Sequence, residues 1–226
     1  GPTAGPAAVV GSVGLFLVGL YGWLYHAFVS HFWSRDGGGS AAASLRWGMI
    51  AFLGSELATF GAVFSYYFWI RAGTWPPAGL PDLTGSLVLA NTALLIASSF
   101  TLHWAHVAIR RDDRRRFVLG LLVTLLLGAV FIAGQIYEYY EFIVHSQFTL
   151  TSGLFGSAFY GLTGLHGLHV SLGAVLIAIV TVRDLLGQYS ADRHVSVSTV
   201  SMYWHFVDAV WIFLVVVLYV GAEIGP

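Results

Sequence analysis

The side chains that could do chemistry lie inside long apolar runs. Glu56 stands in WGMIAFLGSELATFGAVFSYYFW, His166 and His169 in GLTGLHGLHV, and His205 and Asp208 in MYWHFVDAVW. Residues three apart share one face of a helix, so each pair presents its groups together. Carboxyl and imidazole groups in this pattern point to proton handling, to ligation of a metal or haem, or to hydrogen bonds between helices.

The composition places these side chains in a membrane protein. Only 9% of the 226 residues are charged and 57% are apolar, enough for roughly six spans of the ~20 residues that a bilayer requires. All ten basic residues are arginine and the net charge is -1, so we exclude nucleic acid as a partner. The lack of cysteine excludes disulfides, thiolate-ligated clusters and a cysteine nucleophile.

Charges, prolines and polar clusters divide the sequence into six apolar stretches. None alternates with the two-residue period of a membrane-barrel strand, and each is too long for one. We therefore predict an all-α fold, a polytopic transmembrane bundle of about six helices. The stretches are 7–29, 46–71, 87–109, 117–142, 158–182 and 199–221.

A glycine-rich segment separates the first stretch from the others. Three glycines and a serine at 37–40 favour a flexible connection. We predict a first transmembrane helix within 1–34, a cytoplasmic linker over 35–45 and a five-helix transmembrane bundle over 46–226. The second stretch should end near Gly73, ahead of the prolines of WPP.

The arginines orient the bundle, because positively charged loops stay on the cytoplasmic side. The second and fourth connections hold only Arg71, and the other nine arginines lie in the first, third and fifth. We therefore expect alternating helices with both chain ends on the outer face. Near the third connection, His103, His106 and the arginine cluster are expected to contact headgroups or lie at the surface. The cluster comprises Arg110, Arg111, Arg114, Arg115 and Arg116.

Glu56 is expected near the bilayer midplane, ten residues from Arg46. An acidic side chain at the membrane centre costs about 2.5–3.5 kcal/mol, so Glu56 should face protein or a water cavity, protonated or paired. A hydrogen-bonded structural carboxyl and a functional proton site both stay open. His169 lies at the same predicted depth, so the two residues are candidate partners.

The paired histidines of the fifth stretch admit several interpretations. Gly161, Gly164 and Gly167 recur at the spacing of His166 and His169, which favours close approach of another helix. The pair alone lacks the third or fourth ligand that a metal needs. A b-type haem needs imidazoles from two facing helices at matched depth, and the predicted depths leave room for one such site, not two.

The remaining polar residues have structural interpretations. His205 and Asp208 form a set that can orient an imidazole, but no nucleophile accompanies them in a recognisable pattern. We interpret them as a polar pair that packs the last helix against its neighbours. Glu138 and Glu141 lie among tyrosines in IYEYYE, typical of an aromatic belt, and we expect both to be solvated.

Several strings in this sequence resemble, in order and spacing, those of subunit III of haem-copper cytochrome c oxidases. The resemblance covers 46–221, and its most specific parts are GLHGLHV and YWHFVD. Quinol oxidase subunit III is similar in the last two of these helices, so the electron donor stays open. The strings are RWGMIAFLGSE, WPP, LANT, LHWAH, IYEYYE, FTLTSGLFGSAFYGLTGLHGLHV and YWHFVD.

The resemblance implies a subunit without catalytic residues, haem or metal of its own, packed against catalytic subunit I in a complex with subunit II. Haem and copper belong to those partners. It also implies phospholipid in a cleft between two helix groups and support of proton uptake and of sustained activity. Glu56 matches the family's buried, carbodiimide-reactive glutamate. The other four match motif positions with packing and polar-pairing roles: His166, His169, His205 and Asp208.

The sequence departs from this family in its number of helices. The family commonly has seven with the N-terminus inside, whereas six with the N-terminus outside are predicted here, as though the family's first helix were missing. The lipid cleft would then lie between the first stretch and the other five. We expect a multi-pass protein of a prokaryotic plasma membrane. A proton-coupled transporter is disfavoured, because internal repeats and broken helices are not apparent.

Overall fold

The computed structural model describes residues 40–73, 75, 80 and 82–223, together with positions 11, 14, 15, 18, 19 and 22. The expected first helix over 7–29 and residues 35–39 of the expected linker therefore lie outside the continuously described residues. Within the described part of the chain the fold is all-α, apart from one isolated bridge between Ser190 and Arg193. The predicted fold class is confirmed.

Five long helices make up the described bundle. Each is long and apolar enough to cross a membrane, so the chain is a multi-pass membrane protein. The π-helical segment η2 (Glu141–His145) prolongs the third of them, and η3 (Val215–Val220) followed by α8 (Gly221–Glu223) prolongs the last. The five are α3 (Ser40–Arg71), α4 (Ser86–Arg110), α5 (Arg114–Tyr140), α6 (Gly153–Leu185) and α7 (Val195–Leu214).

The start of α3 differs from the prediction. The helix begins at Ser40, so the linker predicted over 35–45 is wrong for its last six residues. Three alanines follow Ser40, and alanine has the highest helix propensity, so the chain is helical there. At its other end α3 stops at Arg71, close to the predicted stop near Gly73.

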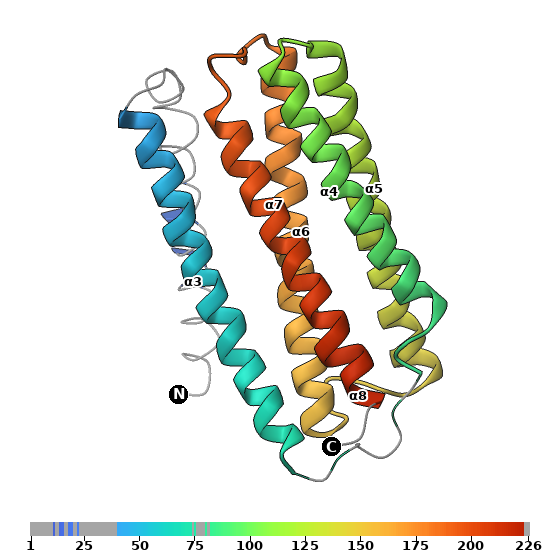
Figure 1. Ribbon diagram of the computed structural model, residues 1–226. Coiled ribbons are helices and arrows are strands. Elements are labelled where there is room, and N and C mark those ends of the chain that lie inside the picture. The colour runs from blue at the N-terminus through green and yellow to red at the C-terminus, as the bar shows by residue number, and fades with distance from the viewer. Residues whose placement is uncertain are drawn as a thin grey trace.

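The helices pack with α4, α5, α6 and α7 as a four-helix group and α3 along one side of it (Figure 1). α3 contacts α6 and α7, and α4 packs on α5 and α7. The α4–α5 and α6–α7 connections, which carry most of the arginines, lie at the same end of the bundle as the start of α3. This alternation of helix direction agrees with the prediction from the arginines.

The C-terminal half of α3 is tied to the end of α7 by a hydrogen bond. The hydroxyl of Tyr67, a fully buried side chain, donates to the carbonyl of Val217 at 2.7 Å. Val217 lies in η3, and a π-helical turn interrupts the regular α-helical ladder and frees backbone groups for such bonds. The irregular turn therefore serves as an attachment point for α3.

Close packing of α6 and α7 depends on Gly173. A Cβ atom there would lie 2.7 Å from Cε3 of the buried Trp204. The glycines predicted to admit another helix do not serve this contact, because a Cβ at Gly161 or Gly167 would meet nothing within 4 Å among the described residues. At Gly164 it would meet only the hydroxyl of Tyr139, at 3.8 Å. Spacing alone does not say which glycine of a helix faces a neighbour.

Gly173→Ala should destabilise the bundle, because the new methyl group must displace the indole of Trp204. We expect a loss of about 1–3 kcal/mol, the usual effect of overpacking. Gly167→Ala on the same helix is the matched control and should be neutral or stabilising by up to about 1 kcal/mol through helix propensity. Thermal unfolding in mild detergent measures both, and equal midpoints for the two variants would contradict this packing.

Candidate functional site

Glu56 and His169 form an ion-pair-like contact between α3 and α6. The carboxyl Oε2 of Glu56 lies 2.9 Å from Nε2 of His169. The side chains are 18% and 11% exposed, so protein surrounds most of both. The contact predicted from their matched depths is confirmed.

The second ring nitrogen of His169 fixes how this pair holds its protons. Nδ1 lies 2.7 Å from the carbonyl oxygen of Leu165, and a carbonyl only accepts, so Nδ1 carries a hydrogen. The Nε2 contact with Glu56 then joins either a neutral carboxyl to a neutral imidazole or a carboxylate to an imidazolium. Both states share one proton and carry no net charge, which suits a site at membrane depth.

Aromatic side chains enclose the Glu56–His169 pair. The ring of Phe60 lies 5.1 Å from the imidazole of His169, and the ring of Tyr203 stacks on it at 6.4 Å. The hydroxyl of Tyr203 also donates to the carbonyl oxygen of His169 at 3.0 Å. The site therefore joins three helices, α3, α6 and α7, around one shared proton.

A second polar cluster joins α4 to α7. The hydroxyl of Ser99 contacts Nδ1 of His205 at 2.9 Å and donates to Oδ2 of Asp208. Asp208 is 5% exposed, and its Oδ1 is enclosed without a hydrogen-bond partner among the described residues. His205 and Asp208 are thus brought together, but through Ser99, which the sequence did not single out.

His166 lies apart from the Glu56–His169 pair. It is fully buried, stacks on Trp211 with ring centroids 5.0 Å apart and meets the ring of Phe131 edge-on at 5.9 Å. Neither ring nitrogen has a hydrogen-bond partner in the described part of the chain. Among the described residues, no three acidic or histidine side chains are grouped in a way that could hold a metal ion.

The residues expected to contact lipid headgroups divide into two groups. His103 is exposed, whereas His106 is partly buried and its Nε2 lies 3.0 Å from the hydroxyl of Ser198, so His106 also joins α4 to α7. Arg114 is half-exposed and pairs with the buried Asp184 at 3.1 Å. The other cluster arginines are exposed: Arg110, Arg111, Arg115 and Arg116.

The expected solvation of Glu138 is wrong. Glu138 is 3% exposed, accepts a hydrogen bond from the hydroxyl of Tyr219 at 3.0 Å and is also bonded by the amide of Gln135. It follows Phe131 by seven residues and Gln135 by three, so all three lie on the inward face of α5. This spacing is the feature of the sequence from which the burial of Glu138 could have been predicted. Glu141 is 39% exposed and lies 3.9 Å from His145, so it remains partly solvated.

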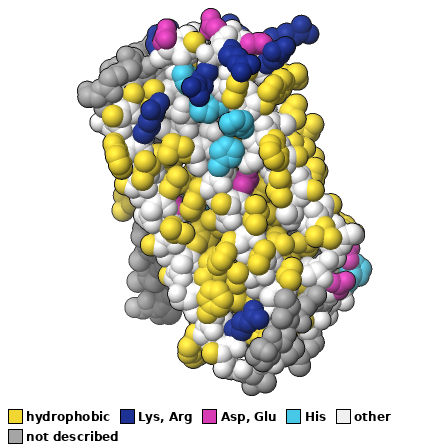
Figure 2. Space-filling view, in the orientation of Figure 1, with side chains coloured by type: hydrophobic (Ala, Val, Ile, Leu, Met, Phe, Trp, Pro, Cys, Tyr) yellow, Lys and Arg dark blue, Asp and Glu magenta, His cyan; other side chains and the backbone are white. Residues whose placement is uncertain are grey.

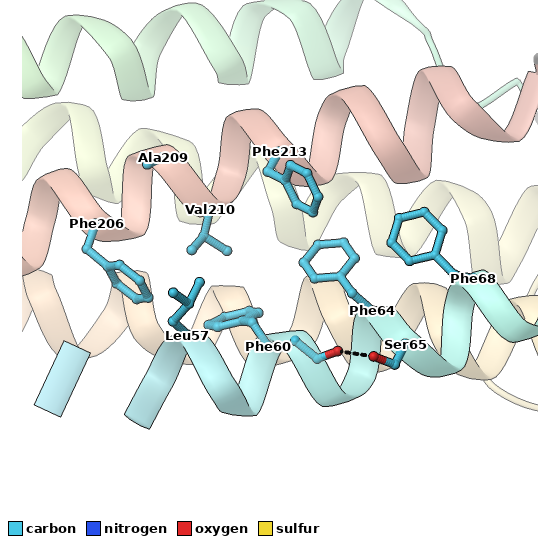
Figure 3. A pocket seen from close by; sticks show the side chains of 10 residues that line it. Leu57, Phe60, Phe64, Ser65, Phe68, Phe206, Ala209, Val210 and Phe213 are labelled. Atoms are coloured by element: carbon cyan, nitrogen blue, oxygen red, sulfur yellow. Dashed lines mark hydrogen bonds between the residues drawn. The ribbon is translucent and has the colours of Figure 1, made fainter. Parts of the chain in front are cut away.

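An apolar groove of about 470 Å³ lies between α3 and α7 (Figure 3). Phe60, Phe64 and Phe68 of α3 line one side, and Phe206 and Phe213 of α7 line the other. The hydroxyl of Ser65 is bonded to the carbonyl of its own helix, at Gly61, so the lining is apolar in effect. The predicted cleft beside the first stretch lies outside the described residues. The full lining is Leu57, Phe60, Gly61, Phe64, Ser65, Phe68, Phe206, Ala209, Val210 and Phe213.

Comparison with known proteins gives a consistent result. The family model for cytochrome c oxidase subunit III matches residues 10–223. The chain is 41% identical to cytochrome c oxidase subunit 3 of Danio rerio over 183 residues, 77% of this chain and 69% of that protein. Identity to the Homo sapiens subunit is 39% with the same coverage. Identity to the Locusta migratoria subunit is 38%, over 77% of this chain and 68% of that protein.

Glu56→Gln should leave folding and assembly intact, because the amide can still hydrogen-bond to Nε2 of His169 without a charge. Glu56→Ala should cost about 1–3 kcal/mol, since it leaves the imidazole of His169 without that partner. Thermal unfolding and yield in mild detergent distinguish the two variants. Loss of assembly in Glu56→Gln would instead mean that the ionised form of the pair is required.

Proposed function

Because this chain belongs to the cytochrome c oxidase subunit III family, we propose that it acts as a non-catalytic subunit of a respiratory haem-copper oxidase. The match of the family model over residues 10–223 is the observation that carries this conclusion. As a member of that family the chain is part of an oxidase complex with other subunits. We assign the haem and copper to the partner subunits, chiefly to the catalytic subunit I and also to subunit II.

The arrangement of the histidines supports a role without a redox centre in this chain. Both ring nitrogens of His169 have hydrogen-bond partners, in Leu165 and Glu56. His106 is bonded to Ser198 and His205 to Ser99. These imidazoles join helices to one another, which is the work expected of a subunit that stabilises its catalytic partner.

Phospholipid is the second ligand that we assign to this chain. The groove between α3 and α7 is open at the bundle surface and lined almost entirely by phenylalanine and aliphatic side chains. An acyl chain matches such a lining, because it buries apolar surface and requires no hydrogen bond. Lipid seated there would fill the gap between the weakly buried α3 and the other helices.

Two features support a role of this chain in proton uptake: the Glu56–His169 pair, and the arginines at the end of the bundle that holds the α4–α5 and α6–α7 connections. The pair holds one shared proton at membrane depth, and exposed arginines lie at the end of α4 and the start of α5. We place this end at the cytoplasmic side of a prokaryotic plasma membrane and the end of α8 outside, because arginine-rich connections stay inside.

Purification of the tagged chain from native membranes in mild detergent tests the proposal. We expect the catalytic haem-copper subunit to co-purify and the preparation to show a Soret band, whereas the chain expressed alone should show none. A Soret band stoichiometric with the isolated chain would assign the haem to this chain and contradict the proposed role.

Depletion of the chain from the purified oxidase is the complementary arm of that experiment. Activity should be present at first, because the redox centres remain. The activity should then decline faster than in the complete enzyme, or the depleted enzyme should take up cytoplasmic protons more slowly. A depleted enzyme that turned over at full rate for as long as the complete enzyme would reduce this chain to a purely structural component.

A further inference from the structure

Polar side chains form a line where α4 and α7 meet, from the exposed His103 to the buried Asp208. Ser99, His103 and His106 follow one another on α4 at spacings of four and three residues, which places them on one stripe. His205 and Asp208 of α7 lie beside this stripe through their contacts with Ser99. Figure 2 shows histidine side chains gathered on this face below the arginines. We call this set the α4–α7 seam.

The α4–α7 seam extends to the middle of the membrane. Ser99 is eleven residues from the end of α4 at Arg110, about 16 Å along the helix axis. His205 is ten residues from the start of α7 at Val195, about 15 Å. Half of a hydrocarbon core of ~30 Å has about this length, so the seam lies at a depth where lipid offers only acyl chains.

Two imidazoles of the seam have unused hydrogen-bonding atoms. His103 is exposed, and no hydrogen bond joins either of its ring nitrogens to another described residue. His205 is partly exposed, and of its nitrogens only Nδ1 has a partner in the described part of the chain, the hydroxyl of Ser99. Polar side chains at this depth normally face protein or water, because lipid cannot satisfy them.

The exposed face of α5 provides a comparison, because it shows which side chains this chain presents where it faces lipid. On α5 the exposed positions at comparable depth are Leu119, Leu122, Leu126 and Val130, all aliphatic. The seam differs from that surface in carrying histidines. α5 and α6 pack on the opposite side of α4 and α7, so these helices do not cover it (Figure 1).

We propose that a membrane-spanning helix of another oxidase subunit packs on the α4–α7 seam and directs a hydrogen-bonding side chain to His103 and His205. This inference rests on the proposed function, since it assigns a face of the chain to the complex. Large apolar side chains border the seam, with Phe100 71%, Trp104 41% and Ile212 45% exposed. They supply the packing surface of the interface, and the imidazoles supply its specificity.

Site-specific photo-crosslinking in the intact complex tests the proposal. A benzophenone amino acid in place of His103 should cross-link this chain to another subunit, identified by mass spectrometry. The same residue in place of Leu122 is the depth-matched control and should give no protein adduct, because Leu122 is 50% exposed and lies eight residues from the start of α5, as His103 lies seven from the end of α4. Adducts only within this chain, no protein adduct at 103, or equal adducts at both positions would overturn the proposal.

His103→Leu provides an independent arm, because it leaves the described contacts of the chain unchanged. A lipid-facing position should accept leucine without loss. We expect instead that roughly threefold less of the chain is retained in the complex under stringent detergent washing, the effect of one interhelical hydrogen bond. Leu126→Ile is the control and should be retained like the original chain. Equal retention of His103→Leu and the original chain would contradict the seam as an interface.

The two proposals fail in different ways. If the chain co-purifies with the haem-copper subunit but position 103 gives no cross-link to it or to another subunit, the seam assignment is wrong and the proposed function stands. If the chain does not co-purify with a haem-copper subunit at all, both are wrong. A cross-link from position 103 to a subunit of the purified oxidase supports both.

Discussion

The structure depends on one constraint: the hydrocarbon of a bilayer cannot satisfy a polar group, so each polar side chain at membrane depth needs a partner in protein or water. Several polar side chains of the described helices meet it by joining two helices. Glu56 bonds His169, Ser99 bonds both His205 and Asp208, and Tyr219 bonds Glu138. These contacts give a bundle of apolar helices a specific arrangement that apolar packing against lipid alone would not select.

The constraint matters most for α3, which has the least buried surface of the described helices. A groove separates part of it from α7, and two polar contacts fasten it at different depths. Glu56 bonds His169 in the middle, and Tyr67 bonds the carbonyl of Val217 near the C-terminal end of α3. Between these points α3 lines the apolar groove. The same helix can therefore be firmly placed and still form one wall of that groove.

Features that depend on one helix at a time were predictable from the sequence, and features that depend on helix rotation were not. Apolar runs located the helices, and matched depths paired Glu56 with His169. The role of Ser99 and the close approach at Gly173 depend on which face of each helix meets a neighbour. Side chains of nearly uniform hydropathy do not reveal that face. The early start of α3 at Ser40 reflects local alanine propensity outweighing the glycines before it.

We conclude that the Glu56–His169 contact holds α3 to the bundle. A double-mutant cycle of Glu56→Ala, His169→Ala and the double variant, followed by reversible unfolding in mixed micelles, measures their coupling directly. A coupling free energy of about 0.5–1.5 kcal/mol in favour of the pair is predicted, the range of hydrogen bonds between membrane helices. Additive effects of the two substitutions, with no coupling, would contradict the claim.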